Sequence, residues 1–121
     1  MTRIGTDIIE ISRVEKNLGN ASFLRRVFSE TELRNYPAQW RAENMAARFC
    51  AKEALIKVFG QYVPMNEISV LNDESGRPYY KLEGTAENVR VELGIDSIDL
   101  SLSHCREYAV AFAIGQCKEE R

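Results

Sequence analysis

The sequence predicts an α+β fold in which an antiparallel sheet packs on a long central helix. Strands are expected at the start of the chain and in two hairpins after its middle, and the helices gather between them. Residues 41–59 carry apolar side chains in two stripes at helical spacing, which indicates a helix buried on two sides. Such a helix lies either at the centre of the domain or between two subunits.

The first part of the chain predicts one strand followed by short helices. Residues 3–9 form an apolar run with β-branched side chains, which is typical of a strand. Ser12 can N-cap a helix that ends near Gly19, and residues 23–28 form a second helical piece.

Capping signals define the helices that follow. Ser29 and Glu32 have the spacing of a capping box, so a helix begins there and stops before Pro37. The long helix then runs from about residue 41 to 59 and stops at Gly60.

Two hairpins around one helix are expected in the remainder. Asn, Asp, Gly and Pro mark a turn at residues 72–78, and apolar residues alternate with polar ones along the fourth predicted strand, residues 98–103. The expected elements are strands at 67–71 and 79–82, a helix at 85–93, and strands at 98–103 and 108–114.

The composition excludes several classes of protein. The chain has 121 residues, 45% hydrophobic and 28% charged, which suits one globular domain. No apolar stretch is long enough for a membrane helix, and no secretory signal is recognisable, so we expect no membrane partner. The three cysteines are widely spaced, which argues against a disulfide framework or zinc site and favours the cytoplasm. One histidine excludes a multi-histidine metal centre.

Charge is unevenly distributed along the chain. The net charge of −2 indicates no nucleic-acid partner. Residues 11–28 nevertheless carry a positive excess from Arg13, Lys16, Arg25 and Arg26. This excess suggests a specific anionic partner, and the alternative is a solvated helix face.

Charged residues interrupt two of the apolar elements. Asp7 lies inside the first predicted strand, where Asp is disfavoured; it is either a cation ligand or a strand-end cap. Glu53 and Lys57 share one face of the long helix, either as functional groups or as an i,i+4 salt bridge. Lys52 falls within an apolar stripe, where the ordinary interpretation is a lysine that snorkels to solvent.

A third polar group lies near the end of the fourth predicted strand. Ser101 and Ser103 project to one side, and His104 follows; the alternative is an ordinary solvated strand end and turn. Taken together, the carboxylates, the lysine and the histidine suit a phosphoryl-transfer centre that uses Mg²⁺. The sequence has no P-loop and no G-x-S-x-G or S-x-x-K motif of acyl transfer.

At these residues the sequence resembles the holo-[acyl-carrier-protein] synthase family, the small bacterial type of 4′-phosphopantetheinyl transferase. The resemblance covers nearly the whole chain, and its motifs occur in the family's order and spacing. The matching positions are Gly5, Asp7 and Arg13 in G-x-D-x-x-x-x-x-R; Phe49, Lys52, Glu53, Ala54 and Lys57 in F-x-x-K-E-A-x-x-K; and Ser101, Ser103, His104, Tyr108, Ala109 and Ala111 in S-x-S-H-x-x-x-Y-A-x-A.

The resemblance implies the fold and the reaction. It implies a single 4′-phosphopantetheinyl transferase domain over residues 1–121, assembled as a homotrimer with active sites between subunits. The implied reaction is the Mg²⁺-dependent transfer of 4′-phosphopantetheine from coenzyme A to a serine of apo acyl carrier protein, which releases adenosine 3′,5′-bisphosphate and serves fatty acid biosynthesis. The alternatives are a non-catalytic coenzyme A or nucleotide-binding module of the same fold and a Mg²⁺-dependent phosphohydrolase.

The resemblance also implies roles for individual residues. Asp7 and Glu53 bind Mg²⁺, and the general base is either Glu53 or a water held by the metal. Lys57 binds the coenzyme A phosphates and stabilises the departing nucleotide, so Asp7, Glu53 and Lys57 form the catalytic set. Ser103 and His104 lie at the nucleotide site. The residues expected to face the acidic carrier protein are Arg13, Arg25 and Arg26.

Overall fold

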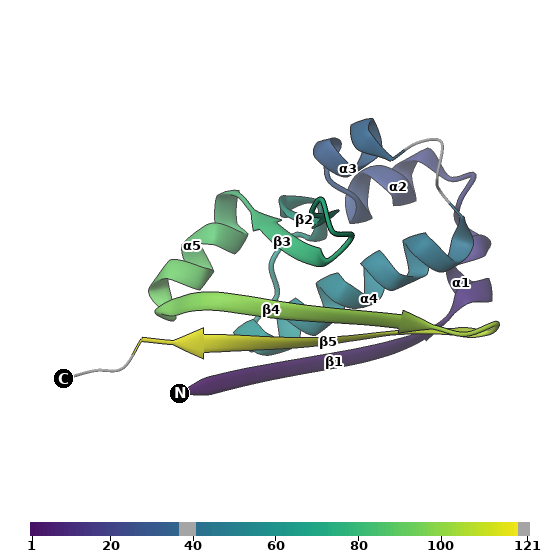
Figure 1. Ribbon diagram of the computed structural model, residues 1–121. Helices are drawn as coiled ribbons and strands as arrows, with labels where there is room; N and C mark the ends of the chain where they lie inside the picture. Colours follow the sequence, from purple (N-terminus) through teal and green to yellow (C-terminus); the bar gives the residue numbers. More distant parts are fainter. Residues whose placement is uncertain (37–40, 119–121) are drawn as a thin grey trace.

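The fold is α+β, as predicted, in a computed structural model that describes residues 1–36 and 41–118. The first elements are the strand β1 (Thr2–Glu10) and the helices α1 (Ile11–Glu15), α2 (Ala21–Val27), α3 (Glu30–Asn35) and α4 (Ala42–Phe59). They are followed by a 3₁₀ turn η2 (Met65–Glu67), β2 (Ile68–Asn72), β3 (Pro78–Leu82), α5 (Gly84–Glu92), β4 (Ile95–His104) and β5 (Tyr108–Cys117) (Figure 1).

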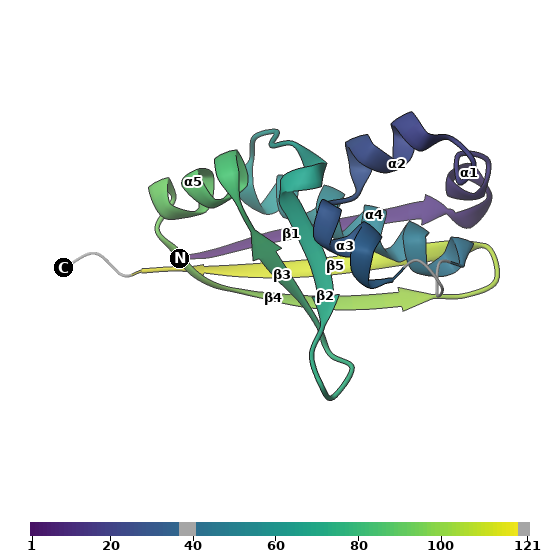
Figure 2. The same ribbon diagram turned by 90° about the horizontal axis from the view of Figure 1, so that it is seen from above.

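Both predicted hairpins form, but they belong to separate sheets. An antiparallel sheet has the strand order β1-β5-β4, and β2 and β3 form a two-stranded antiparallel sheet of their own. Helix α4 lies between the three-stranded sheet on one side and β2, β3, α2 and α3 on the other (Figures 1 and 2). The chain is therefore layered, with α4 as the middle layer.

The central position of α4 explains its two apolar stripes. Its residues Met45, Cys50, Leu55 and Phe59 are at most 2% exposed. Since both sides of α4 are covered by the same chain, the structure selects the first of the two predicted positions, the centre of the domain. No helix among residues 1–36 and 41–118 is long and apolar enough to cross a membrane.

The C-terminal end of α4 is bound by a side chain of β1. The side chain of Arg3 on β1 donates hydrogen bonds to the carbonyl oxygens of Val58 (2.7 Å) and Phe59 (3.1 Å), which have no acceptor role within the helix. Gly60 ends the helix, as predicted, with a φ of 71°. The first strand and the C-terminal end of α4 are thus joined directly.

Glycine allows β1 to approach α4 closely. Gly5 faces the helix, and a Cβ atom at this position would lie 1.9 Å from the carbonyl oxygen of Ala54. Gly115 on β5 also faces α4, but a Cβ there would meet only side-chain atoms of Val58 (3.0 Å) and Ile95 (3.4 Å) before any backbone atom. Of these two glycines, Gly5 therefore allows the closer approach to the helix backbone.

The capping box of α3 is confirmed, whereas Ser12 is not an N-cap. Ser29 and Glu32 exchange the two hydrogen bonds of a capping box. Strand β1 runs directly into α1, which begins at Ile11, and the backbone N–H of Ile11 donates to the carbonyl oxygen of Glu107 (2.8 Å). The cap that the sequence analysis missed is Asn20, whose side chain accepts from Phe23 N (3.1 Å) at the start of α2.

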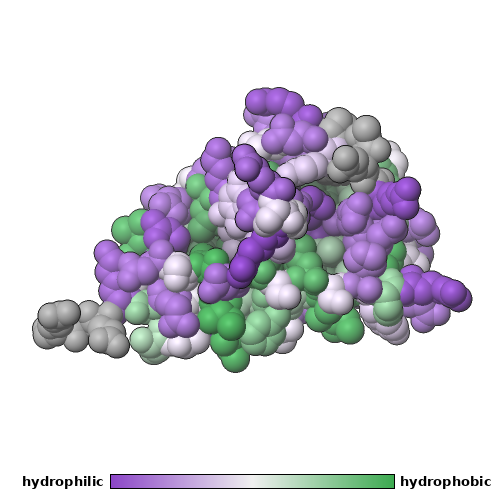
Figure 3. Space-filling model, in the orientation of Figure 1, coloured by the Kyte–Doolittle hydropathy of each residue, from purple (hydrophilic) through white to green (hydrophobic). Residues whose placement is uncertain are grey.

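The outer face of the three-stranded sheet is apolar and uncovered in the single chain. Ile4 and Ile8 on β1 are 62% and 64% exposed, and Tyr108 and Phe112 on β5 are each 43% exposed. Figure 3 shows apolar surface along the rim where this sheet lies. An area of this kind usually marks a contact surface.

Candidate active site

Asp7 and Lys57 meet where β1 packs against α4. Asp7 follows Gly5 on the inner face of β1, and its side chain is 19% exposed. Lys57 reaches back from α4, donates to the carbonyl oxygen of Thr6 (2.8 Å) and lies 3.4 Å from Asp7 Oδ1. Asp7 is paired within the strand with Ala111, so it is not a strand-end cap. The ion pair of Lys57 is with Asp7 rather than with Glu53, one turn away on the same helix.

Glu53 completes this group. It is half-buried on α4. Burial raises the pKa of Glu53, the carboxylate of Asp7 raises it further, and the ammonium of Lys57 opposes the shift. The three predicted catalytic side chains Asp7, Glu53 and Lys57 are therefore close enough to act on one another.

The two carboxylates suit a magnesium ion. Like charges held near each other are stabilised by a cation between them, and the effect of Asp7 on Glu53 is this repulsion. Mg²⁺ is commonly bound by one or two carboxylates, with waters and substrate phosphates as the other ligands. Within residues 1–36 and 41–118 no three His, Cys, Asp or Glu side chains are grouped to hold a metal. An ion at Asp7 and Glu53 would thus need further ligands from water or the substrate.

A thiol lies beside the carboxylates. Cys50 is fully buried, and its Sγ contacts the carbonyl oxygen of Ala109 at 3.4 Å. Burial raises the pKa of Cys50 to about 12, and the carboxylates of Asp7 and Glu53 add to the shift. Cys50 stays protonated at neutral pH and contributes no charge to the site.

Lys52 does not snorkel, and its environment was missed by the sequence analysis. Its side chain is 0% exposed and pairs with the equally buried Glu32 at 2.5 Å. Burial lowers the pKa of Lys52 to about 8, and Glu32 opposes the shift. Two signals existed in the sequence, a lysine in an apolar stripe and a capping-box glutamate, but neither identifies the other as its partner.

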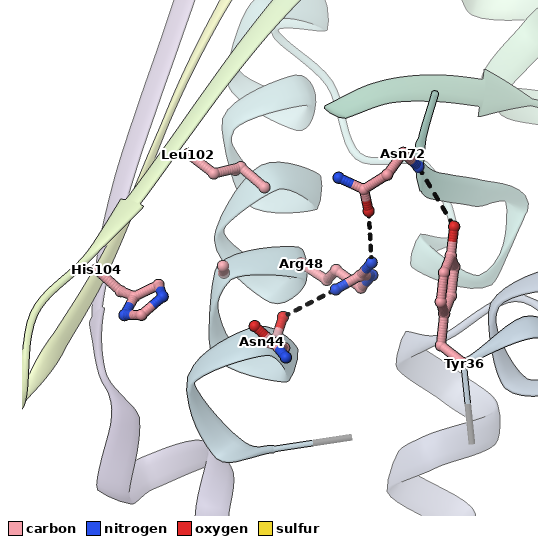
Figure 4. A pocket seen from close by; sticks show the side chains of 7 residues that line it. Tyr36, Asn44, Arg48, Asn72, Leu102 and His104 are labelled. Carbon is pink, nitrogen blue, oxygen red and sulfur yellow. Dashed lines mark hydrogen bonds between the residues drawn. The ribbon is translucent and has the colours of Figure 1, made fainter. Parts of the chain in front are cut away.

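His104 lines a pocket between β4 and α4. The pocket has a volume of about 370 Å³, and Figure 4 shows His104 on one side of it and Arg48 on the other. Arg48 donates to Asn72 Oδ1 (3.0 Å), and its guanidinium lies 4.6 Å from the centre of the Tyr36 ring. The lining residues are Tyr36, Asn44, Ala47, Arg48, Asn72, Leu102 and His104. Cationic and amide donors of this kind suit a phosphate-bearing ligand.

Arg48 was not among the site residues predicted from the sequence. Arg48 immediately precedes Phe49 of the second motif, and it is a charged residue on a largely buried helix. A charged residue at that position is the feature of the sequence that could have indicated a site.

One chain does not bring all predicted site residues together. Asp7 and Leu102 both pair with Ala111, so β5 separates Asp7 from β4 by about 10 Å across the sheet. Ser103 is exposed and alternates with Leu102 and His104, so it lies on the outer face of the sheet, away from Asp7. In the single chain Ser103 therefore lies apart from both Asp7 and the pocket beside His104.

The three predicted docking arginines are exposed on neighbouring helices. Arg13 lies on α1, and Arg25 and Arg26 are in the last turn of α2. The Arg26 guanidinium lies 6.0 Å from the centre of the Phe23 ring. All three are available to an external partner in the single chain.

The sequence of the chain is similar to those of one enzyme family over most of its length. The family described as the 4′-phosphopantetheinyl transferase superfamily matches residues 3–113. A holo-[acyl-carrier-protein] synthase of Ruminiclostridium cellulolyticum is 40% identical over 119 residues, which cover 92% of this chain and 89% of the relative. One from Dehalococcoides mccartyi is 44% identical over 123 residues, 96% of this chain and 99% of the relative.

Solved structures are similar over the same length. The acyl carrier protein synthase of Plasmodium yoelii with ADP bound aligns with a TM-score of 0.88 and 32% identity, over 97% of this chain and 96% of that one. The complex of the synthase of Chronobacterium ammoniagenes with coenzyme A aligns with a TM-score of 0.85 and 30% identity, over 98% and 99%.

Proposed function

The chain belongs to the 4′-phosphopantetheinyl transferase superfamily, as a member of the holo-[acyl-carrier-protein] synthases, and from this membership we propose its reaction and site. It transfers 4′-phosphopantetheine from coenzyme A to a serine of apo acyl carrier protein, with Mg²⁺, and releases adenosine 3′,5′-bisphosphate. The reaction serves fatty acid biosynthesis in the cytoplasm. The observation that carries the proposal is the convergence of Asp7, Glu53 and Lys57 between β1 and α4.

The reaction requires one bond to form and one to break. The serine oxygen of the carrier attacks the phosphorus that bears the pantetheine arm, and the bond from this phosphorus to the bridging oxygen of the nucleotide breaks. Negative charge then accumulates on the departing nucleotide. Lys57 is half-exposed and anchored at Thr6 O (2.8 Å), so it presents its ammonium where a phosphate can reach it.

The two carboxylates share one task in this proposal. Asp7 and Glu53 would hold Mg²⁺, which would neutralise charge on the pyrophosphate of coenzyme A. Either Glu53 or a water held beside it would accept the serine proton as the general base.

The pocket beside His104 is the proposed site for the nucleotide end of coenzyme A. Arg48 and His104 line it, and the related structures were solved with ADP or coenzyme A. Ser103 lies on the other face of the sheet and joins a nucleotide site only if another subunit packs there. The uncovered Ile4, Ile8 and Phe112 supply an apolar surface for such packing, and we propose a homotrimer with sites between subunits.

The acyl carrier protein is proposed to dock on α1 and α2. Exposed Arg13, Arg25 and Arg26 give this end of the molecule a positive surface on a protein of net charge −2. Charges at the rim of an interface chiefly speed and orient the encounter with an acidic partner.

A transfer assay separates this function from its rivals. The protein is incubated with coenzyme A, Mg²⁺ and apo carrier protein, and all components are measured by mass spectrometry. We expect the carrier to gain the mass of one phosphopantetheine. Unchanged coenzyme A would instead indicate a binding module, and hydrolysis without transfer would indicate a phosphohydrolase.

A matched pair of variants tests the site. Asp7→Asn removes a carboxylate of the proposed metal site, and Asp96→Asn removes one at the far end of β4. Asp7→Asn is expected to lose transfer activity and Asp96→Asn to keep it, with both variants folded by circular dichroism. Equal activity in the two variants would reject the assignment of Asp7.

A further inference from the structure

The ammonium of Lys52 binds three different parts of the chain. It donates to the carbonyl oxygen of Val27 (2.6 Å), to Glu32 Oε1 (2.5 Å) and to the carbonyl oxygen of Met65 (3.1 Å). A lysine has three donors, so all of them are used. The same ammonium lies 5.1 Å from the centre of the Phe28 ring. Lys52 thus connects α4 with the end of α2, the first turn of α3 and η2.

Glu32 extends the connection to the second sheet. Its Oε1 also accepts from the backbone N–H of Ser29 (2.9 Å), and its Oε2 accepts from that of Val70 on β2 (3.0 Å). The hydroxyls of Ser29 and Ser69 are 2.6 Å apart and share one hydrogen bond. Ser29 and Glu32 are at most 1% exposed and Ser69 is 5% exposed. We call Lys52, Glu32, Ser29 and Ser69 the buried polar cluster.

The end of α2 held by this cluster is the end that carries Arg25 and Arg26. Carbonyl groups in the last turn of a helix lack partners within it, and outside donors supply them here. Lys52 binds the carbonyl oxygen of Val27, and Asn66 Nδ2 binds that of Arg25 (3.2 Å). The backbone on either side of Arg26 is therefore fixed from outside α2, while its side chain remains exposed.

Stability alone does not require an ion pair at this place. A buried pair loses hydration on folding, and apolar residues of similar volume are often as stable. What an apolar pair cannot do is fix the Val27 and Met65 carbonyl oxygens by hydrogen bonds in one geometry. Lys52 also precedes Glu53 directly on α4, so one rigid helix presents the metal ligand on one side and holds the basic end of α2 on another.

We propose that Lys52 is a positioning residue for carrier-protein transfer: together with Glu32 it holds the basic end of α2 at a fixed place relative to Glu53. The inference rests on the proposed function, in which Arg25 and Arg26 meet the carrier and Glu53 lies at the reacting centre. Its consequence is that losing the cluster impairs the use of the carrier protein more than the use of coenzyme A.

The test uses the double variant Lys52→Met/Glu32→Gln. Methionine keeps an unbranched chain without charge, and glutamine can still form a capping box with Ser29. No uncompensated charge is left inside, so the variant remains testable where Lys52→Met alone fails to fold. The control is Arg90→Met/Glu87→Gln, which removes an ion pair on α5 with the same net change in charge.

Steady-state kinetics with the carrier and coenzyme A varied separately give the first readout. We expect the KM for the carrier to rise about tenfold, a typical coupling within one network. The KM for coenzyme A and the maximal rate stay close to wild type, as does every constant of the control. Adding Arg26→Glu should raise the KM for the carrier by a smaller factor in this variant than in wild type, because α2 is already displaced. Unchanged carrier kinetics, or equal losses for both substrates, would overturn the proposal.

Amide hydrogen exchange tests the same link without any substrate. We expect faster exchange in residues 21–27 of the double variant, with α4 unchanged and with no such difference in the control. Unaltered protection of α2 would overturn the proposal even if the wild-type protein transfers phosphopantetheine. If the wild type transfers nothing, the proposed function fails, and hydrogen exchange still decides whether Lys52 fixes α2.

Discussion

Replacing Gly5 by alanine should damage the active site through the backbone. The new Cβ would lie 1.9 Å from the carbonyl oxygen of Ala54, and Cβ atoms in real structures stay at least about 3.0 Å from such atoms. Because the obstacle is helix backbone, no side-chain rotation relieves it. Strand β1 must therefore move away from α4 by about 1 Å, and Asp7 and the Thr6 carbonyl oxygen move with it.

The displacement sets the expected magnitudes. Overpacking of a core typically costs about 1–3 kcal/mol. At about 4 °C per kcal/mol for a domain of this size, the Tm should fall by roughly 4–12 °C. A misplacement of about 1 Å at a reacting centre can cost about 100-fold in rate. We therefore expect Gly5→Ala to lose activity well below its Tm, while the protein is still folded.

Gly115→Ala is the matched control. Its Cβ would meet side-chain ends, Val58 Cγ1 at 3.0 Å and Ile95 Cγ2 at 3.4 Å, which can shift without moving the strand. Thermal unfolding followed by circular dichroism and transfer rates at a temperature where both variants are folded give the comparison. Gly115→Ala should retain the wild-type rate. If the two variants have the same Tm and rate, the contact at Gly5 does not position Asp7, and the reasoning is refuted.

Three further predictions concern charged residues. Glu53→Gln should stabilise the folded protein at neutral pH, because the raised pKa of Glu53 makes its ionised form unfavourable in the folded state. This gain should vanish below about pH 4.5, where Glu53 is protonated in both the folded and the unfolded state. Denaturant titrations at several pH values would measure the gain. Lys57→Met should lower the maximal rate more than it raises the KM for coenzyme A, whereas a change in KM alone would make Lys57 a ground-state binder. Arg13→Glu should slow transfer to the carrier and make the rate of transfer less dependent on salt, while the affinity for coenzyme A stays unchanged. Kinetics at several salt concentrations test this, and a change in coenzyme A binding alone would contradict it.

The parts of the fold that follow from local patterns were predictable. The strand and helix order, the capping box of Ser29 and Glu32 and the end of α4 at Gly60 each depend on residues close in the sequence. The start of α1 was not predicted correctly: the helix continues β1 directly, and the N–H of Ile11 pairs with Glu107, which lies far along the chain. The separation of the hairpins into two sheets depends likewise on which strands meet after folding.

In the candidate site too, the identity of the residues could be predicted from the sequence, whereas their pairing could not. Asp7, Glu53 and Lys57 could be selected because each is a charged residue in an apolar element. The pairing of Lys57 with Asp7 instead of Glu53 required the packing of β1 on α4. The Lys52–Glu32 pair was also beyond sequence reasoning, since its members lie on separate helices. Spacing within one helix identifies neighbours on that helix only.

The strand order β1-β5-β4 also bears on how the protein is made. Asp7 on β1 pairs with Ala111 on β5, so the first strand to be synthesised can pair only after the last strand has been made. At about 5–20 residues per second, the intervening chain takes roughly 5–20 s to synthesise. Mixed α/β domains commonly fold faster than this, in well under a second. Translation, and not folding, therefore sets when the sheet closes over α4, and a nascent chain that stalls before β5 leaves β1 without its strand partner.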